Sequence, residues 1–316
     1  MARVVYSRHY NIGFFGLERL HPFDSKKYGR AWRALQDHFG ASLQQLSISP
    51  PRAVSEKELL TVHTPDYFKE LRRSTYLARA LEIGMLWMVP RWLINWRVLR
   101  PMRWATMGSL VAAREALTHG LAVNLGGGFH HAKPDAGEGF CIFSDIAFLI
   151  DSLRREGALS QSDTVVYVDC DAHQGNGICH ALMFDPRVLI FDMFNASIYP
   201  LSDESARERI DCCIKLKPGC RDAEYLNLLK VRLPTFLDEG NASRRIGLAI
   251  YNAGTDVHED DPLGRLGLTD QGILDRDLMV VEELRRREIP TVMLTSGGYT
   301  RKSYQLIASS VIRILK

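Results

Sequence analysis

The sequence has few of the features that mark a secreted or a nucleic-acid-binding protein. Only six of its 316 residues are cysteine. That number does not suggest a disulfide scaffold in a chain of this length, and it favours a reducing compartment. The formal net charge is only +3, so no overall attraction to nucleic acid follows. We therefore expect a cytoplasmic protein, or a nuclear one in a eukaryote, without direct nucleic-acid binding.

Long hydrophobic runs are also lacking. The most apolar stretch, residues 83–94, is too short for a membrane span and is interrupted by Pro90 and Arg91. The first six residues lack the apolar core of a signal peptide, and we expect them to form a strand. The chain contains no internal repeat, low-complexity tract or obvious linker. We therefore expect one domain over residues 1–316 and no transmembrane segment.

The chain does contain a regular alternation of short apolar runs and helical patterns. The expected strands are Val4–Tyr6, Ala122–Leu125, Val165–Asp169, Val188–Met193, Ile246–Tyr251 and Thr291–Leu294. The expected helices are Asp24–Phe39, Ser55–Leu60, Asp66–Ser74, Ala105–His119, Ile146–Arg155, Ala223–Leu237, Thr269–Arg287 and Tyr304–Leu315. Short buried strands separated by helices predict an α/β fold, with a parallel sheet covered by helices on both faces.

Residues 75–104 differ from the rest of the chain because tryptophan and arginine alternate in them. These residues are Trp87, Arg91, Trp92, Trp96, Arg97, Arg100, Arg103 and Trp104. Our first interpretation is an amphipathic helix and loop packed on the body of the domain. The alternatives are a rim that handles apolar substrates and a weak contact with a membrane surface.

Polar residues follow several expected strands, at the ends where α/β sheets place their chemistry. Asp169, Asp171 and His173 alternate at one strand end, so they project from one face; a helix-capping cluster is the alternative interpretation. Asp256 follows another strand, where a lone aspartate is more often a turn residue than a ligand. Together Asp171, His173 and Asp256 form a three-ligand set typical of catalytic zinc, although ferrous iron would also accept it.

Two other strand ends carry candidate catalytic groups. Glycines 126–128 precede His130 and His131, but the third glycine of a dinucleotide-binding fingerprint would fall on His131. The glycines more plausibly allow a sharp turn that brings two imidazoles into a pocket. Tyr299 follows the last strand, where its hydroxyl would be placed to donate to an oxyanion; packing is the alternative role.

These strand-end segments together resemble the histone deacetylase family. The matching strings are Gly127-Gly128-Phe129-His130-His131, Asp169-Cys170-Asp171-Ala172-His173-Gln174-Gly175-Asn176-Gly177, Ala253-Gly254-Thr255-Asp256 and Ser296-Gly297-Gly298-Tyr299. They occur in the family's order and span nearly the whole chain. The segments most similar to the class IV branch are Tyr10-Asn11-Ile12, Leu20-His21-Pro22-Phe23-Asp24 and Asn252-Ala253-Gly254-Thr255-Asp256.

The resemblance implies a single-domain arginase/deacetylase fold with an eight-stranded parallel sheet. It also implies one zinc ion, held by Asp171, His173 and Asp256, and hydrolysis of N-acyl-lysine amides in a protein or peptide substrate. The metal would activate a water from which His131 takes a proton, and Tyr299 would donate to the oxyanion. Class IV similarity suggests long fatty acyl groups in preference to acetyl.

The same resemblance assigns supporting roles to neighbouring residues. His130 would support the developing charge and be oriented by Asp169, whereas Asn176 would orient His131. Some family members have a carboxylate at the position of Asn176. A neutral amide stabilises an imidazolium less, so it should leave His131 more often neutral and ready to act as a base.

The resemblance also implies a substrate channel and a second ion. Gly139 and Phe140 match a motif lining the acyl-lysine channel, and Tyr199 matches the facing aromatic wall. A monovalent cation such as K⁺ would be held by oxygens of Asp169, Asp171 and His173. The acidic rim residue that holds the substrate backbone in many deacetylases is not placed by the sequence. Glu82 is the only carboxylate within residues 75–104.

Three other functions fit parts of this pattern. An arginase-type two-metal enzyme would need a carboxylate two residues after His173, where this chain has Gly175. An acetylpolyamine amidohydrolase would use the same zinc chemistry, but its acidic gatekeeper corresponds to Leu263. A non-catalytic acyl-lysine binding protein would be expected to have lost His131, Tyr299 or a metal ligand, all of which are present.

Overall fold

A computed structural model describes residues 2–13, 24 and 26–316 of the chain. Leu20-His21-Pro22-Phe23, part of the class IV similarity, lies outside these residues. The strands are β1 (Arg3–Val5), β2 (Ser47–Ile48), β3 (Leu121–Asn124), β4 (Thr164–Asp169), β5 (Val188–Asn195), β6 (Cys212–Leu216), β7 (Ile246–Asn252) and β8 (Thr291–Leu294). They form one eight-stranded sheet in the order β2-β1-β3-β8-β7-β4-β5-β6. All neighbouring strands are parallel, which confirms the predicted fold class.

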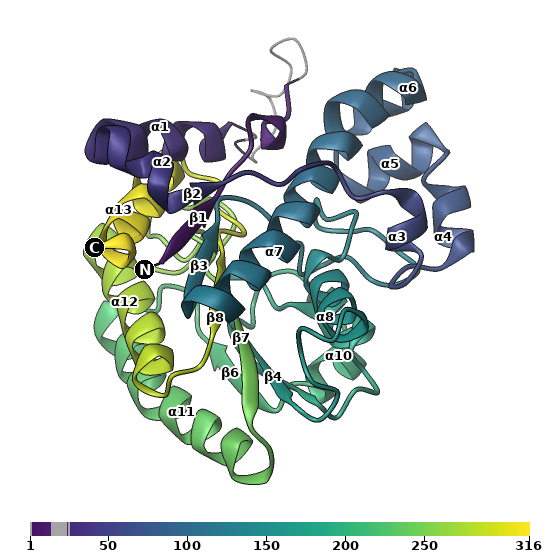
Figure 1. Cartoon of the computed structure of the whole chain (residues 1–316). Helices are drawn as coiled ribbons and strands as arrows, with labels where there is room; N and C mark the ends of the chain where they lie inside the picture. The colour runs from purple at the N-terminus through teal and green to yellow at the C-terminus, as the bar shows by residue number, and fades with distance from the viewer. Residues whose placement is uncertain (1, 14–23, 25) are drawn as a thin grey trace.

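Helices cover both faces of this sheet (Figure 1). The longer ones are α1 (Lys27–Phe39), α7 (Arg100–His119), α8 (Asp145–Arg155), α11 (Asp222–Ser243), α12 (Asp270–Arg286) and α13 (Ser303–Leu315). On one face α7 packs on β1, β3 and β8 with α8 beside it. On the other, α11, α12, α13 and α1 contact one another in that order, and α11 lies on β4 and β5. The central strands are therefore buried on both sides, as their continuous apolar runs predict.

Shorter helical segments complete the chain. They are η1 (Arg8–Tyr10), η3 (Gly40–Ser42), α2 (Leu43–Leu46), α3 (Glu56–Leu59), α4 (Pro65–Glu70), α5 (Ser74–Ala80), η4 (Gly84–Met88), α6 (Arg91–Ile94), η5 (Asn95–Leu99), α9 (Asn176–Ala181) and α10 (Glu204–Glu208). The predicted helix at Asp66 starts one residue earlier, because Thr64 caps it and Pro65 occupies its first turn. The helix predicted from Thr269 begins at Asp270, and Thr269 caps it by accepting a hydrogen bond from the amide of Gly272.

Two strands were not predicted, and both lie at the edges of the sheet. β2 has only two residues, which is too short to show a period. β6 alternates buried and partly exposed residues, with Lys215 pointing to solvent, as an edge strand does. The helix predicted from Ala105 also begins earlier, at Arg100, because Pro101 lies in its first turn, where proline is tolerated.

The segment 75–104 is a series of short helices and not one amphipathic helix. It passes through η4, α6 and the π-helical turn η5 directly into α7. Trp104 is partly buried and stacks on His9, as packing on the body predicts. Trp87, Trp92 and Trp96 are exposed. In the described part of the chain, no helix has both the length and the hydropathy needed to cross a bilayer.

Candidate active site

Sheet order explains why four distant segments meet at one place. β3, β8, β7 and β4 are consecutive neighbours in the middle of the sheet. Because all four run parallel, the loops that follow them emerge at the same edge. These loops carry His130 and His131 after β3, Tyr299 after β8, Asp256 after β7, and Asp171 with His173 after β4. The structure therefore brings together every metal-ligating and catalytic residue that the sequence predicts.

The three predicted ligands form one buried cluster. Their nearest ligand atoms all lie within 4.8 Å of one another. Nδ1 of His173 lies 2.9 Å from Oδ2 of Asp256 and 3.2 Å from Oδ1 of Asp171. Burial alone would lower the pKa of His173, but hydrogen bonds to the two carboxylates raise it to about 10. Two buried carboxylates and one imidazole this close together form a ligand set that a divalent cation would bind.

Backbone and hydroxyl groups fix the two carboxylates. Oδ2 of Asp171 accepts hydrogen bonds from the hydroxyl of Ser296 and the amide of Gly297, each at 3.0 Å. Oδ1 of Asp256 accepts one from the amide of Ala172 at 2.9 Å. Burial and the nearby charge of Asp171 raise the pKa of Asp256 to about 7. Two buried carboxylates this close need a counter-charge, which supports a cation at this position.

His130 is held as a charged imidazole. Its Nδ1 lies 2.8 Å from Oδ2 of Asp169, which also accepts from the Tyr167 hydroxyl at 2.5 Å. The other oxygen of Asp169 accepts from the Asn252 amide at 3.0 Å. Burial would lower the pKa of His130, but attraction by Asp169 and Asp171 raises it to about 9. The Asp169–His130 contact is the one that the sequence resemblance implies.

His131, in contrast to His130, is held as a neutral imidazole. Its Nδ1 lies 2.8 Å from Oδ1 of Asn176, whose amide nitrogen donates to Glu138 at 2.8 Å and Asp203 at 3.2 Å. These two acceptors orient the amide so that its oxygen faces the imidazole. Burial, followed by repulsion from His130 and His173, lowers the pKa of His131 well below its ordinary value. His131 is therefore neutral, with Nδ1 protonated and Nε2 free to accept a proton.

Aromatic side chains surround the entrance to this centre. The rings of Phe140 and Tyr299 lie 5.8 Å apart, and Tyr199 packs edge-on against His131 at 5.1 Å. Gly139 has φ of +54°, and a Cβ there would lie 2.4 Å from the His131 ring. Only glycine allows the backbone to approach that imidazole so closely. These residues line an outer pocket of about 270 Å³ that also contains Leu263.

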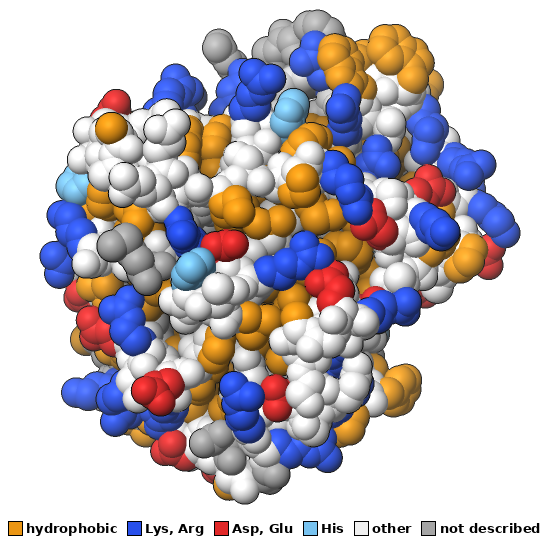
Figure 2. Space-filling view, in the orientation of Figure 1, with side chains coloured by type: hydrophobic (Ala, Val, Ile, Leu, Met, Phe, Trp, Pro, Cys, Tyr) orange, Lys and Arg blue, Asp and Glu red, His pale blue; other side chains and the backbone are white. Residues whose placement is uncertain are grey.

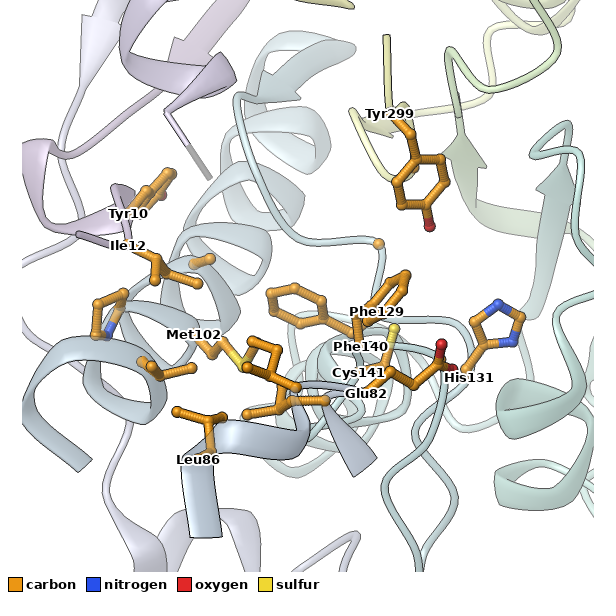
Figure 3. A pocket seen from close by; sticks show the side chains of 18 of the residues that line it. Tyr10, Ile12, Glu82, Leu86, Met102, Phe129, His131, Phe140, Cys141 and Tyr299 are labelled. Carbon is orange, nitrogen blue, oxygen red and sulfur yellow. The ribbon is translucent and has the colours of Figure 1, made fainter. Parts of the chain in front are cut away.

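A second, larger cavity of about 440 Å³ adjoins the same centre, and we call it the apolar chamber. Figure 3 shows His131 and Tyr299 at one end and Tyr10, Ile12 and Leu86 at the other. Most of its other walls are apolar side chains, including Leu81, Ile83, Met85, Met88, Val89, Val98, Pro101, Met102, Ala105, Phe129 and Phe140. Many of them belong to residues 75–104, so this segment contributes to the site itself. Glu82 borders both the chamber and the outer pocket.

Sequence reasoning missed several supporting residues. Asp145 accepts hydrogen bonds from the amides of Gly128 at 2.9 Å and Phe129 at 2.8 Å, which fixes the loop before the two histidines. Asp192 pairs with Asp169 across β4 and β5, and its Oδ1 has no hydrogen-bond partner among the described residues. Burial and Asp169 raise the pKa of Asp192 well above its usual range. The sequence did contain a signal for Asp192, because it is the one charged residue in the apolar run Val188–Met193.

Comparison with known proteins identifies the family. The family model of the histone deacetylase domain matches residues 21–315. The chain is 40% identical to histone deacetylase 2 of Arabidopsis thaliana, over 98% of this chain and 77% of that protein. It is 26% identical to histone deacetylase 8 of Xenopus tropicalis, over 81% of this chain and 69% of that protein.

The fold comparison gives the same architecture. The crystal structure of the HDA15 HD domain superposes with a TM-score of 0.75 at 21% identity, and the match covers 99% of this chain and 90% of that one. At this identity the likeness concerns the fold alone. The family assignment comes from the domain match and from the 40% identical relative. The chain belongs to the histone deacetylase domain family and is a hydrolase of amide bonds.

Proposed function

We propose that this protein hydrolyses N-acyl-lysine amides with one Zn²⁺ held by Asp171, His173 and Asp256. The observation that carries the proposal is the convergence of these buried ligands with a neutral imidazole, His131. When bound, the ion would polarise the acyl carbonyl and acidify a water molecule. Fe²⁺ accepts the same ligands, so metal identity is part of the test. The protein fits best in the class IV branch, on the residues described above for that similarity.

The residues of the chain have distinct tasks in this reaction. Nε2 of His131 accepts a proton from the attacking water and returns it to the leaving lysine amine, because Asn176 keeps the proton on Nδ1. His130, which Asp169 keeps charged, supports the developing negative charge. The Tyr299 hydroxyl donates to the oxyanion. Burial and the nearby carboxylates raise the pKa of Tyr299 well above its ordinary value, so the hydroxyl keeps its proton.

The substrate would enter through the outer pocket. The lysine stem lies between Phe140 and Tyr199, beside Gly139, and its acyl group reaches the apolar chamber. A chamber of about 440 Å³ is far larger than an acetyl group needs, which supports long fatty acyl chains. Each methylene transferred from water contributes roughly 0.8 kcal/mol. The six extra methylenes of octanoyl would contribute up to about 5 kcal/mol in the chamber.

A monovalent cation such as K⁺ would occupy a second position near Asp169, Asp171 and His173. Oδ2 of Asp192 accepts a hydrogen bond from the amide of Gly175 at 3.0 Å, but its Oδ1 has no donor among the described residues. This buried oxygen, beside Asp169, supports the proposal because a cation nearby would satisfy it. The cation would hold the loop after β4, on which two of the zinc ligands lie.

Polyamine deacylation is the second candidate, and one observation favours it. Among the described residues that line the two pockets, Glu82 is the only one with a carboxylate, and a carboxylate there would attract a polycation even though Leu263 is neutral. In a peptide substrate Glu82 would instead accept hydrogen bonds from backbone amides. Comparing the turnover of N-acetylspermidine with that of an acyl-lysine peptide distinguishes the two functions. If Glu82 attracts a polycation, the polyamine should be the preferred substrate.

The direct test of the proposed function combines metal content with hydrolysis of a fluorogenic acyl-lysine peptide. We expect one Zn²⁺ per chain and turnover that is lost with the metal. Stoichiometric zinc without turnover on any acyl chain would instead indicate a non-catalytic acyl-lysine binding protein.

A further inference from the structure

The surface outside the apolar chamber carries a cluster of exposed apolar side chains. We call residues 83–100, which form it, the anchor segment. Its exposed members, with their exposed fractions, are Met85 (58%), Trp87 (61%), Met88 (57%), Trp92 (67%) and Trp96 (47%). Figure 2 shows hydrophobic and basic side chains together at the upper right, over the place of α6 in Figure 1. A water-facing protein surface rarely contains a contiguous apolar patch without a partner.

The charged residues within the segment that carries this patch all have one sign. From residue 83 to residue 114 the sequence contains no aspartate or glutamate. Arg91 and Arg100 are exposed on the anchor segment. The guanidinium of Arg97 lies 4.1 Å from the centre of the Trp96 ring, so one residue pair combines an apolar face with a positive charge. The partner of this surface must therefore accept apolar insertion and carry negative charge.

We propose that the anchor segment docks on the surface of an anionic phospholipid bilayer. Trp87 and Trp92 enter the boundary between headgroups and acyl chains, the depth that amphipathic aromatic rings favour. Arg91, Arg97 and Arg100 remain among the headgroups, where each basic residue contributes about 1 kcal/mol on an anionic leaflet. The anchor segment lies on the membrane surface and does not cross it.

Charge complementarity favours lipid over a second copy of this chain. In a symmetric pair the same patch would face itself, so the arginines of one copy would lie against those of the other. No carboxylate of the anchor segment could compensate for that repulsion. An anionic bilayer offers both an apolar interior and negative headgroups, which match the two properties of the patch.

The position of the patch also connects it with catalysis, and this step rests on the proposed function. Leu86, Val89 and Val98 belong to the anchor segment and line the apolar chamber, while its tryptophans face outward. The same short helices are thus the wall of the chamber and the docking surface. A fatty acyl group released or presented at the membrane would have a short path between lipid and chamber.

Sedimentation of the zinc-loaded protein with large unilamellar vesicles tests the docking. We expect binding to vesicles that contain about one third phosphatidylserine, weaker binding to phosphatidylcholine alone, and loss of binding at high salt. Trp87→Ser combined with Trp92→Ser should raise the half-saturating lipid concentration at least about tenfold. Neither side chain lines the chamber or the outer pocket, so hydrolysis of a water-soluble acyl-lysine peptide should not change.

Matched variants distinguish specific docking by this surface from nonspecific adsorption to vesicles. Phe184→Ser combined with Val231→Ser removes two exposed apolar side chains elsewhere and should leave vesicle binding intact. Arg91→Gln with Arg100→Gln should weaken binding only to anionic vesicles, whereas Lys215→Gln with Lys217→Gln should not. Vesicle binding that is equally strong with and without phosphatidylserine, and unchanged in the tryptophan variant, would overturn the proposal. A second result would also overturn it: the native protein does not bind vesicles but forms a dimer in light scattering, and the tryptophan variant does not form that dimer.

Vesicle binding needs no substrate, so it can fail while hydrolysis succeeds. The reverse holds as well, because a protein that docks on anionic vesicles without hydrolysing any acyl-lysine peptide would contradict the proposed function alone.

Discussion

Nδ1 of His131 lies 2.8 Å from Oδ1 of Asn176, and both side chains are buried. The partner is an amide and carries no charge, so it fixes the imidazole without stabilising the imidazolium. Together with burial and two positive neighbours, this keeps the pKa of His131 low. The proposed general base therefore stays neutral at about pH 6.5, the ordinary pKa of a histidine, and at somewhat lower pH.

Replacement of Asn176 by aspartate should change the pH profile. A carboxylate beside Nδ1 favours the protonated imidazole, so the pKa of His131 should rise and the acidic limb of kcat/KM should move to higher pH. The variant should lose most activity near pH 6 and least near pH 8. The profile is measured at equal zinc content. An acidic limb that stays in place would mean that it belongs to a group other than His131.

His131→Ala and Tyr299→Phe should each reduce turnover without removing the metal. Loss of a general base typically costs about 10²–10⁴ in rate, and loss of an oxyanion donor about 10²–10³ in kcat. Neither side chain belongs to the three-ligand cluster, so zinc content measured by atomic emission should remain at one per chain. Loss of zinc in either variant would show that the roles are assigned incorrectly.

Removal of the metal should lower stability as well as activity. Without the ion, two buried carboxylates lie beside His173 with no cation between them and the imidazole, whereas the ion binds only the folded site. At a free zinc concentration 100 times Kd, binding adds about 2.7 kcal/mol to the free energy of unfolding. Chelation should therefore lower Tm, and added Zn²⁺ should restore it. A Tm that is unaffected by chelation and by Asp256→Ala would argue against a bound ion.

Narrowing the chamber should alter acyl-chain preference. Val98→Phe places a larger side chain in the chamber wall and should lower kcat/KM for myristoyl-lysine while leaving acetyl-lysine nearly unchanged. Val111→Phe is the matched control, because this buried valine lies on α7 and lines neither pocket. Overpacking costs roughly 1–3 kcal/mol at either position, so Tm is measured for both. Equal effects of the two variants would indicate general destabilisation.

The central part of the fold was predictable from the sequence because its signals are local. Six strands are continuous apolar runs, and the chemistry follows directly after four of them. The edge strands β2 and β6 were missed because a two-residue strand has no period and Cys212–Leu216 shows only a short alternation. Pro90 is a local signal for one break within residues 75–104, since α6 begins directly after it, whereas the π-helical turn η5 has no such signal.

The first layer of the site was also predictable, whereas its supporting layer was not. Adjacent strand ends identify His130, His131, Asp171, His173, Asp256 and Tyr299. Glu138 and Asp203 reach Asn176 from loops distant in sequence. Glu82 borders both pockets only because the segment that carries it folds over the centre. Such long-range contacts are set by tertiary packing and leave no spacing to detect.

A comparison of kcat/KM for acetyl-, octanoyl- and myristoyl-lysine versions of one peptide, with the zinc-loaded protein, tests the central claim most directly. The buried ligand cluster and the apolar chamber predict zinc-dependent hydrolysis in which the long chains are clearly preferred over acetyl. A clear preference for acetyl would contradict the assignment of the chamber to the acyl group, and turnover that survives complete removal of zinc would contradict the proposed mechanism.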